Sequence, residues 1–174
     1  MKQRFEGLVD EHGGWLLQLA RLMLKSASDA EDVVQDSLVK LWHQLGNIDR
    51  GAERAWLITC TRNACLDRIR AKQRQSGLLQ QVQSVDRELG RHIDDHGPAA
   101  ATEHHERAQQ LHEAIRQLPE PARSLVILRD IQDVDVATVA NTLALTPNQV
   151  KVYTFRARRT LRRYLEQSCH EQVA

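Results

Sequence analysis

The sequence lacks long apolar segments and a regular cysteine pattern. Its three cysteines, Cys60, Cys65 and Cys169, show no close pairing pattern, which indicates free thiols in a reducing compartment. No stretch of about 18 apolar residues is present, and no apolar run follows a basic N-terminus. Membrane insertion and secretion are therefore not expected, and the cytoplasm is the expected location.

The sequence also lacks the residue groupings that catalysis needs. No nucleophile–base pair, glycine-rich phosphate loop or paired acidic site is recognisable, so we assign no catalytic residue and expect no enzyme. A metal protein is an alternative, because the chain has eight histidines and three cysteines. They supply no set of four well-spaced ligands of the kind that structural zinc uses, so solvated histidines without metal or cofactor are favoured. The groupings are His92 with His96, His104 with His105, His112, and Cys169 with His170.

What the sequence does have is charge gathered in blocks, although its net charge is only +1. Residues 29–45 carry four acids and one lysine (−3), residues 54–74 carry six bases and one acid (+5), and residues 147–165 carry six bases and no acid (+6). Solvated helix faces would explain any one block, but they explain two basic helices less easily. The pattern favours an acidic face for a basic protein surface and two basic faces for nucleic acid.

Helical spacing of apolar residues, without strand signals, indicates an all-α fold. Residues 4–25 form one helical pattern, and we expect a kink or break at Gly13–Gly14 because each glycine costs up to about 1 kcal/mol in a helix interior. Ser28 to Glu31 is a capping box that starts a second helix, and residues 52–73 form a third. We predict that residues 1–75 form a small helical bundle. The second helix is expected to bury Val33, Val34, Leu38, Leu41, Trp42 and Leu45.

The pattern weakens over residues 76–102, which are rich in Gln, Ser, Asp, Gly and Ala. We interpret this segment as a flexible linker. A second all-α unit is predicted over residues 103–170, in which Pro119–Pro121 turns the chain and residues 122–130 form a helix. The helix before that turn carries an apolar stripe of Leu111, Ala114, Ile115 and Leu118.

A helix-turn-helix closes the second unit. Residues 135–143 form a short helix, and residues 144–146 have the three-residue length of the turn in this motif. Thr146 as a cap and Pro147 at the first helical position begin the last helix. The turn usually has glycine, so Ala144 is expected to be strained if it takes a left-handed conformation.

The last helix has two different faces. The inward stripe consists of Val150, Thr154, Ala157, Leu161 and Leu165, which recur at helical spacing. The opposite face carries Asn148, Val152, Phe155, Arg156, Arg159 and Arg163. Polar and apolar contact groups near the start of a helix, with guanidinium groups further along, suit a DNA major groove better than they suit a plain surface helix.

In their order and spacing, these motifs resemble the extracytoplasmic-function sigma factors of bacterial RNA polymerase over nearly the whole chain. In the first unit the resemblance rests on residues 28–36, 41–42, 54–57, 62–63 and 66–70. In the second it rests on residues 114–119, 123, 139–140, 150–151 and 155–158. The chain departs from the family pattern at Ala137–Thr138, where Glu is usual, and at Ala144 and Gln132–Asp133, where Gly is usual.

The resemblance implies three binding surfaces. The acidic second helix would dock on core RNA polymerase, with candidate residues Asp32, Gln35, Asp36 and Lys40. The loop 47–53 and the third helix would open the −10 element of promoter DNA, where an amide and cations suit a flipped base on a single strand, with candidates Trp56, Arg62, Asn63 and Arg68. The last helix would read the −35 element, with candidates Asn148, Gln149, Lys151, Val152, Phe155, Arg156 and Arg159.

The resemblance also implies a regulatory partner, an anti-sigma factor that would hold the chain inactive by hiding both DNA faces. The flexible linker would make that arrangement geometrically easy. The main alternative is a stand-alone helix-turn-helix regulator whose N-terminal bundle senses a ligand or dimerises. Such a regulator would have no need of a second basic helix.

Overall fold

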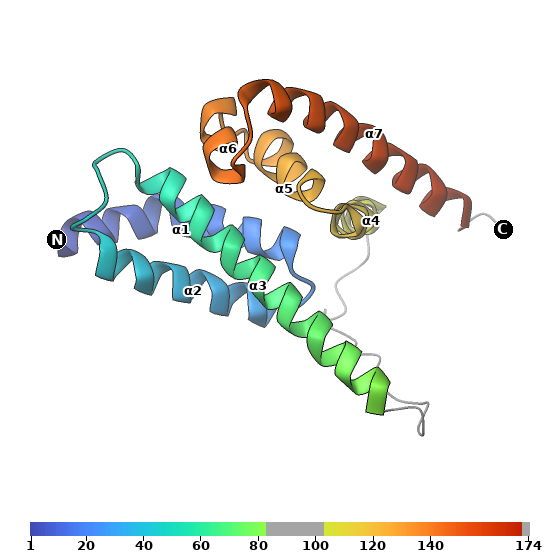
Figure 1. The fold of residues 1–174 in the computed structure, drawn as a ribbon, viewed down its shortest axis with the longest axis horizontal. Helices are drawn as coiled ribbons and strands as arrows, with labels where there is room; N and C mark the ends of the chain where they lie inside the picture. The colour runs from blue at the N-terminus through green and yellow to red at the C-terminus, as the bar shows by residue number, and fades with distance from the viewer. Residues whose placement is uncertain (83–102, 172–174) are drawn as a thin grey trace.

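The N-terminal unit is a bundle of three helices. The computed structural model describes the backbone of residues 1–82 and 103–171, and the side chains of residues 1–75 and 107–167. Helix α1 spans Lys2–Met23, α2 spans Ala27–Gln44 and α3 spans Glu53–Val82. Each helix packs on the other two (Figure 1). Their fully enclosed side chains form the core of this unit: Leu16, Leu19, Met23, Leu41, Leu45, Leu57 and Ile58.

Three sequence predictions for this unit need correction. Helix α1 runs unbroken through Gly13–Gly14, because Leu16, Leu19 and other residues on both sides are buried against α2 and α3, which offsets the helix penalty of glycine. Helix α2 is capped by Ser26, whose hydroxyl accepts the Asp29 amide hydrogen, so its cap lies two residues before the predicted one at Ser28. Trp42 is 40% exposed, not buried, because it lies at the edge of the bundle.

The C-terminal unit is also entirely helical within the described residues. Helices α4 (Glu103–Gln117), α5 (Ala122–Val126), α6 (Val136–Leu143) and α7 (Pro147–Glu171) are joined by short turns, and a π-helical turn, η1 (Ile127–Ile131), follows α5. The predicted helix over 122–130 is therefore an α-helix only as far as Val126. The core of the unit consists of Ile115, Leu118, Leu125, Ile127, Leu128, Val139, Val150 and Ala157. Leu111, the first residue of the predicted apolar stripe on α4, is 36% exposed.

The helix-turn-helix forms as predicted, and its caps explain its limits. The Asp135 carboxylate accepts the amide and hydroxyl hydrogens of Thr138 at 2.9 and 2.6 Å, which starts α6. Ala144 ends α6 in the left-handed region, with φ 52° and ψ 44°. The alanine therefore has the strained conformation that a glycine would adopt without steric cost.

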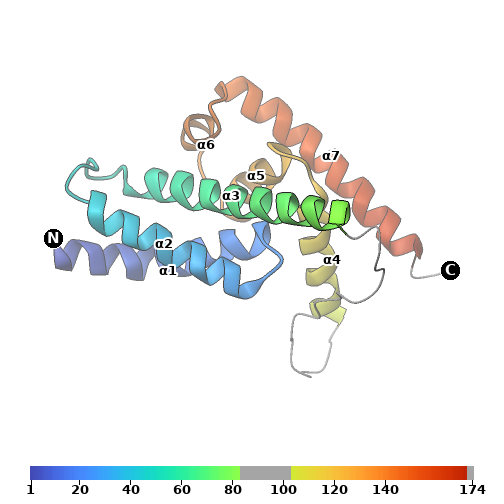
Figure 2. The ribbon, with the colours of Figure 1, turned by 60° about the horizontal axis from the view of Figure 1, so that its bottom comes forward.

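The two units lie against each other along α3 and α1 (Figures 1 and 2). Helix α3 contacts α6, while α1 contacts α4 and η1. Figure 2 shows α3 crossing in front of the C-terminal unit, and in both figures the N-terminus and the end of α7 lie at opposite ends of the molecule. Helix α3 continues to Val82, into the start of the predicted linker, and residues 83–102 lie outside the described part of the chain.

Candidate nucleic-acid and polymerase interfaces

Helix α7 buries the predicted inward stripe and presents the opposite face. Val150, Thr154 and Ala157 are 1%, 6% and 2% exposed, because they pack against the rest of the helix-turn-helix unit. Val152 is 39% exposed and Phe155 is 70% exposed. An aromatic ring this exposed buries little surface and contributes little to the stability of the fold.

Three cations on this face are not engaged by the described part of the protein, whereas Arg163, further along, donates to the Thr160 hydroxyl at 3.5 Å. Within the described residues, the side chains of Lys151, Arg156 and Arg159 make no hydrogen bond or ion pair. Arg158, on the flank of the same helix, is different, because its guanidinium binds the Asp130 carboxylate, with Nη2 and Oδ1 2.5 Å apart. That pairing raises the pKa of Arg158 above its usual value, mainly through the hydrogen bond to Asp130.

The start of α7 holds a reciprocal cap. The Thr146 hydroxyl accepts the Gln149 amide hydrogen at 3.2 Å, and the Gln149 side-chain oxygen accepts the Thr146 amide hydrogen at 2.8 Å. Gln149 is therefore committed in part to shaping the helix start, while Asn148 beside it is exposed. The cap fixes the residue at which α7 begins, and thereby which of the following side chains face outward.

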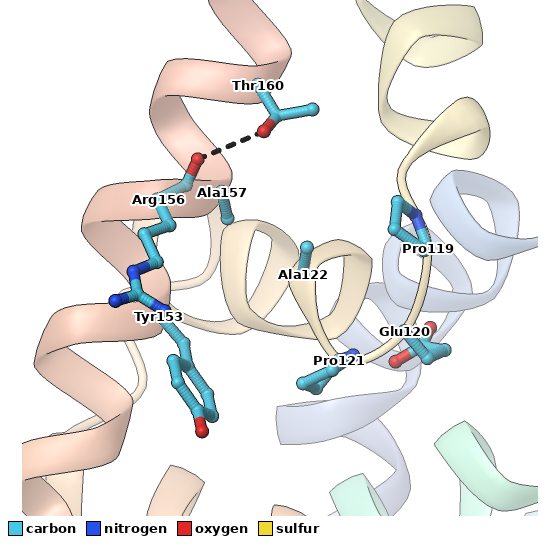
Figure 3. Close-up of a pocket in the computed structure, with 8 residues that line it drawn as sticks. All are labelled: Pro119, Glu120, Pro121, Ala122, Tyr153, Arg156, Ala157 and Thr160. Atoms are coloured by element: carbon cyan, nitrogen blue, oxygen red, sulfur yellow. Dashed lines mark hydrogen bonds between the residues drawn. The ribbon is translucent and has the colours of Figure 1, made fainter.

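A hollow of about 350 Å³ lies behind this face, between α7 and the turn from α4 to α5 (Figure 3). Tyr153 and Arg156 border it on the α7 side, and Pro121 and Ala122 border it on the other. Glu120 closes one end, at the side that faces the N-terminal unit. The Arg156 side chain lies at the rim of the hollow, beside Tyr153 (Figure 3).

The loop before α3 is held by a charged cluster that the sequence analysis missed. Arg4 donates from Nη2 to the Glu53 carboxylate at 2.5 Å, and from Nη1 and Nη2 to the carbonyl oxygens of Leu45 and Ile48, each at 3.1 Å. The same carboxylate accepts the amide hydrogen of Gly51, whose φ is +90°. Arg4 thereby fixes both ends of the loop 47–53. No local signal marks this role, because Arg4 and Glu53 are 49 residues apart in the chain.

This cluster shifts the ionisation of Glu53. The hydrogen bond from Arg4 is the main cause that lowers the pKa of Glu53 below its ordinary value, and it outweighs burial, which acts in the opposite direction. Glu53 is only 8% exposed, so its charge depends on the arginine. Next to Glu53 in the chain, Arg54 places its guanidinium over the Trp15 ring, 5.5 Å from the ring centroid. This adds a cation–π contact at the start of α3.

The four −10 candidates on α3 fall into different environments. Trp56 is half-buried against the core, and Asn63 is exposed. Arg68 forms ion pairs with Asp29 at 3.4 Å and with Asp32 at 3.1 Å, so it joins α3 to α2. Arg62 points toward the C-terminal unit, where its guanidinium binds Ser124 and Glu120. Both candidate arginines are thus already paired within the protein, which the sequence analysis did not predict.

The exposed face of α2 carries the polymerase candidates. Gln35, Asp36 and Lys40 are exposed, and within the described residues their side chains make no ion pair. Asp32 is also exposed but is shared with Arg68. Val39, 56% exposed, lies on this same face at 100° per residue, a position that helical spacing alone could have revealed. Trp42 flanks it, with its ring edge-on to Phe5 at a centroid distance of 5.1 Å.

The described residues contain no group of three histidine, cysteine or acidic side chains that could hold a metal ion. His92 and His96 lie outside the described part of the chain, as do the side chains of His104, His105, Cys169 and His170. His112 is described, and its pKa is lowered by burial and by nearby Arg116. Burial raises the pKa of the Cys65 thiol to about 12, so this cysteine is a core residue with little thiolate character. No helix in the described ranges has both the length and the apolar character needed to cross a membrane.

Both units match known families. Residues 8–75 match the model of Sigma-70 region 2, and residues 108–161 match that of Sigma-70, region 4. The ECF RNA polymerase sigma factor SigM of Mycobacterium tuberculosis is 31% identical over 163 residues, which cover 92% of this chain and 76% of that protein.

Two solved structures share the fold. CnrH in complex with the cytosolic domain of CnrY is 26% identical, with a TM-score of 0.69 over 96% of this chain and 90% of that one. The sigma factor RpoE in complex with the anti-sigma factor NepR from Bartonella quintana has a TM-score of 0.71 over 94% of this chain and 98% of that one. At 22% identity, the second likeness concerns the fold alone.

Proposed function

The chain belongs to the ECF RNA polymerase sigma factors, and from that premise we propose how its surfaces divide the work of promoter recognition. The C-terminal unit (103–170) reads the −35 element of promoter DNA, the N-terminal unit (1–75) opens the −10 element and holds core polymerase, and residues 76–102 link them. The chain performs no chemistry of its own. It acts in the cytoplasm, where polymerase and DNA are. Family membership does not favour a stand-alone regulator.

The single observation that carries the −35 assignment is the exposed face of α7. Lys151, Arg156 and Arg159 are cations without an internal partner in the described residues, and they surround Val152 and Phe155. Guanidinium and ammonium groups bind phosphates and guanine edges, while apolar side chains contact thymine methyl groups. Asn148 and the capped start of α7 set the register of the helix in the groove.

The −10 assignment is supported by the loop that Arg4 holds and by the polar face of α3. A loop fixed at both ends can form a pocket for a flipped base without losing much entropy on binding. Further along α3, Asn63 offers an exposed amide, Arg62 and Arg68 offer cations for the backbone of the single strand, and Trp56 offers an aromatic edge.

Core polymerase binds the exposed face of α2. Asp32, Gln35, Asp36 and Lys40 supply its polar contacts, and we add Val39 as an apolar anchor at the centre of the same face. An apolar residue surrounded by polar ones is the usual arrangement of a protein–protein contact. A protein inhibitor covers these surfaces when the factor is off, and the likeness to CnrH, which is 26% identical and was solved in complex with the cytosolic domain of CnrY, supports this.

Transcription with purified core polymerase tests the proposal. The wild-type chain is expected to direct initiation from specific sites on genomic DNA of its source, with footprints at the −35 and −10 elements. Initiation that does not depend on the chain, or footprints at neither element, would contradict it.

Two variants with the same change of charge test the polymerase surface on α2. Asp36→Arg reverses an exposed charge on α2, so it should abolish pull-down of core polymerase while leaving the fold intact. Glu6→Arg makes the same change of charge on α1, outside the proposed surfaces, and should bind polymerase normally. An equal loss of polymerase binding in both variants would mean that the net charge of the chain, and not the α2 face, determines binding.

A further inference from the structure

The contact between the two units engages one cation almost completely. Arg62, on α3, donates from Nε to the Ser124 hydroxyl at 2.7 Å and from Nη2 to the Glu120 carboxylate at 3.1 Å. Its side chain is only 12% exposed, whereas that of Glu120 is 27% exposed. A third donor, Nη1, reaches Asn63 on the same helix at 3.3 Å. The guanidinium therefore has little capacity left for another ligand.

The acceptors on the C-terminal unit are held in place for this contact. The Ser124 hydroxyl donates its hydrogen to Glu120 Oε2 at 2.6 Å, which leaves its lone pairs to accept from Arg62. Ser124 is 1% exposed and belongs to α5, so it cannot move without its helix. A carboxylate oxygen and a hydroxyl oxygen side by side present to arginine the same paired acceptors that a phosphate presents.

The other polar contacts between the units are weaker, while buried apolar side chains of both units belong to one continuous core. Lys25 and Glu113 are 3.8 Å apart, with side chains 76% and 44% exposed, so solvent screens that pair. Gln132 Nε2 donates to the Trp15 carbonyl oxygen at 3.1 Å, which adds one neutral hydrogen bond. Among the polar contacts between the units, the pairing of Arg62 is therefore the most buried.

The two DNA surfaces differ in this arrangement. The face of α7 remains exposed, with Phe155 70% exposed, whereas Arg62 on α3 is covered by the α4–α5 corner. Resting on the function proposed above, we propose that Glu120 and Ser124 act as an internal brake, which occupies Arg62 as a DNA phosphate would. The free chain can then bind a −35 element but not a −10 strand. Separation of the two units releases Arg62.

The brake makes a quantitative prediction. The affinity of a ligand for a protein is reduced by the fraction of molecules in the competent state. If roughly one molecule in ten is open, removing the brake raises the apparent affinity for single-stranded DNA about tenfold. Affinity for the −35 duplex, which binds an exposed face, should stay constant.

Glu120→Arg in the full chain tests this, because it places a second cation against Arg62. The probe is a short fluorescein-labelled single-stranded DNA of mixed sequence, measured by fluorescence anisotropy, and small-angle X-ray scattering reports the radius of gyration. Glu6→Arg is the matched control, since it changes the net charge equally on a surface away from the contact. Glu120→Gln, which keeps the shape of the side chain, provides a milder variant should Glu120→Arg fail to fold.

A charge swap completes the test. Arg62→Glu combined with Glu120→Arg should restore the compact radius of gyration. The double variant should still bind single-stranded DNA weakly, because Arg62 is no longer present to bind it. The expected result is that Glu120→Arg expands the chain and binds single strands about tenfold more tightly than Glu6→Arg does. An unchanged radius, or expansion without tighter binding, would overturn the brake. Polymerase-dependent transcription by the wild-type chain in the same preparation tests the proposed function separately, because it does not require that the free chain be closed.

Discussion

Helices α3 and α7 are both basic, but the fold treats their cations in opposite ways. On α3, Arg62 binds Glu120 and Arg68 binds Asp29 and Asp32, so both candidate DNA ligands have partners inside the protein. On α7, Arg156 and Arg159 have none among the described residues. Similar charge along a helix thus leads to unpaired cations in one unit and to paired cations in the other.

The difference shows what a charge block can mean. An arginine with an internal carboxylate partner stabilises the arrangement of helices and must exchange that partner for a phosphate before it binds DNA. An arginine without such a partner loses only water on binding, so it contributes more to the affinity of the free chain. We therefore expect α7 to govern binding to duplex DNA by the free chain and α3 to act only after rearrangement.

The largest effect is expected from Arg4→Ala in the N-terminal unit. This change removes the hydrogen bonds that hold the loop 47–53 and leaves the buried Glu53 carboxylate without its cation, so the free energy of unfolding should fall by about 2 kcal/mol. Chemical denaturation measures it. The control is Arg21→Ala, which breaks an exposed pair with Glu31 and should cost under about 1 kcal/mol. Equal losses would show that the loop cluster is not special.

Arg156→Ala should weaken binding to a −35 duplex about tenfold, or about 1.4 kcal/mol, because it removes one unpaired cation from the reading face. Affinity for core polymerase should not change. Arg158→Ala removes the same charge from the same helix, but Arg158 is held by Asp130, so the loss should be smaller. If Arg158→Ala has the larger effect, the comparison of paired and unpaired cations fails.

Acid should weaken the N-terminal unit through Glu53. The pKa of Glu53 is lowered by folding, so its contribution to stability is complete above the ordinary value of 4.5 and is lost as the pH falls through the lower folded value. The unfolding free energy of the wild-type chain should therefore approach that of Glu53→Gln below this range. Denaturation series at several pH values would reveal it, and a constant difference down to low pH would contradict it.

The smallest expected effect concerns the turn of the helix-turn-helix. Ala144 has a φ of 52°, which glycine adopts without strain, so Ala144→Gly should stabilise the chain by about 0.5–1 kcal/mol. The same exchange at exposed Ala137, inside α6, should destabilise it by about 1 kcal/mol. Thermal unfolding of the two variants measures the change in stability, which should be positive for Ala144→Gly and negative for Ala137→Gly. A loss of stability in both would refute the strain at Ala144.

Much of the fold was predictable from sequence where the cause is local. Helix α6 begins at its Asp135 cap, α7 begins at Pro147 after Thr146, and Ala144 takes the left-handed turn conformation. The predictions that were wrong concern contacts between helices. Trp42 lies on the apolar stripe of α2 but at the edge of the bundle, so periodicity marks it as buried although 40% of it is exposed.

The sequence by itself determined the all-α architecture, the family, and the exposed cationic face of α7, because helical periodicity and capping act over a few residues. Only the tertiary structure decided which cations are free and which are engaged. Arg62 meets Glu120 across 58 residues of chain, and Arg4 meets Glu53 across 49. Long side chains choose partners by distance in space, which no spacing along the chain encodes.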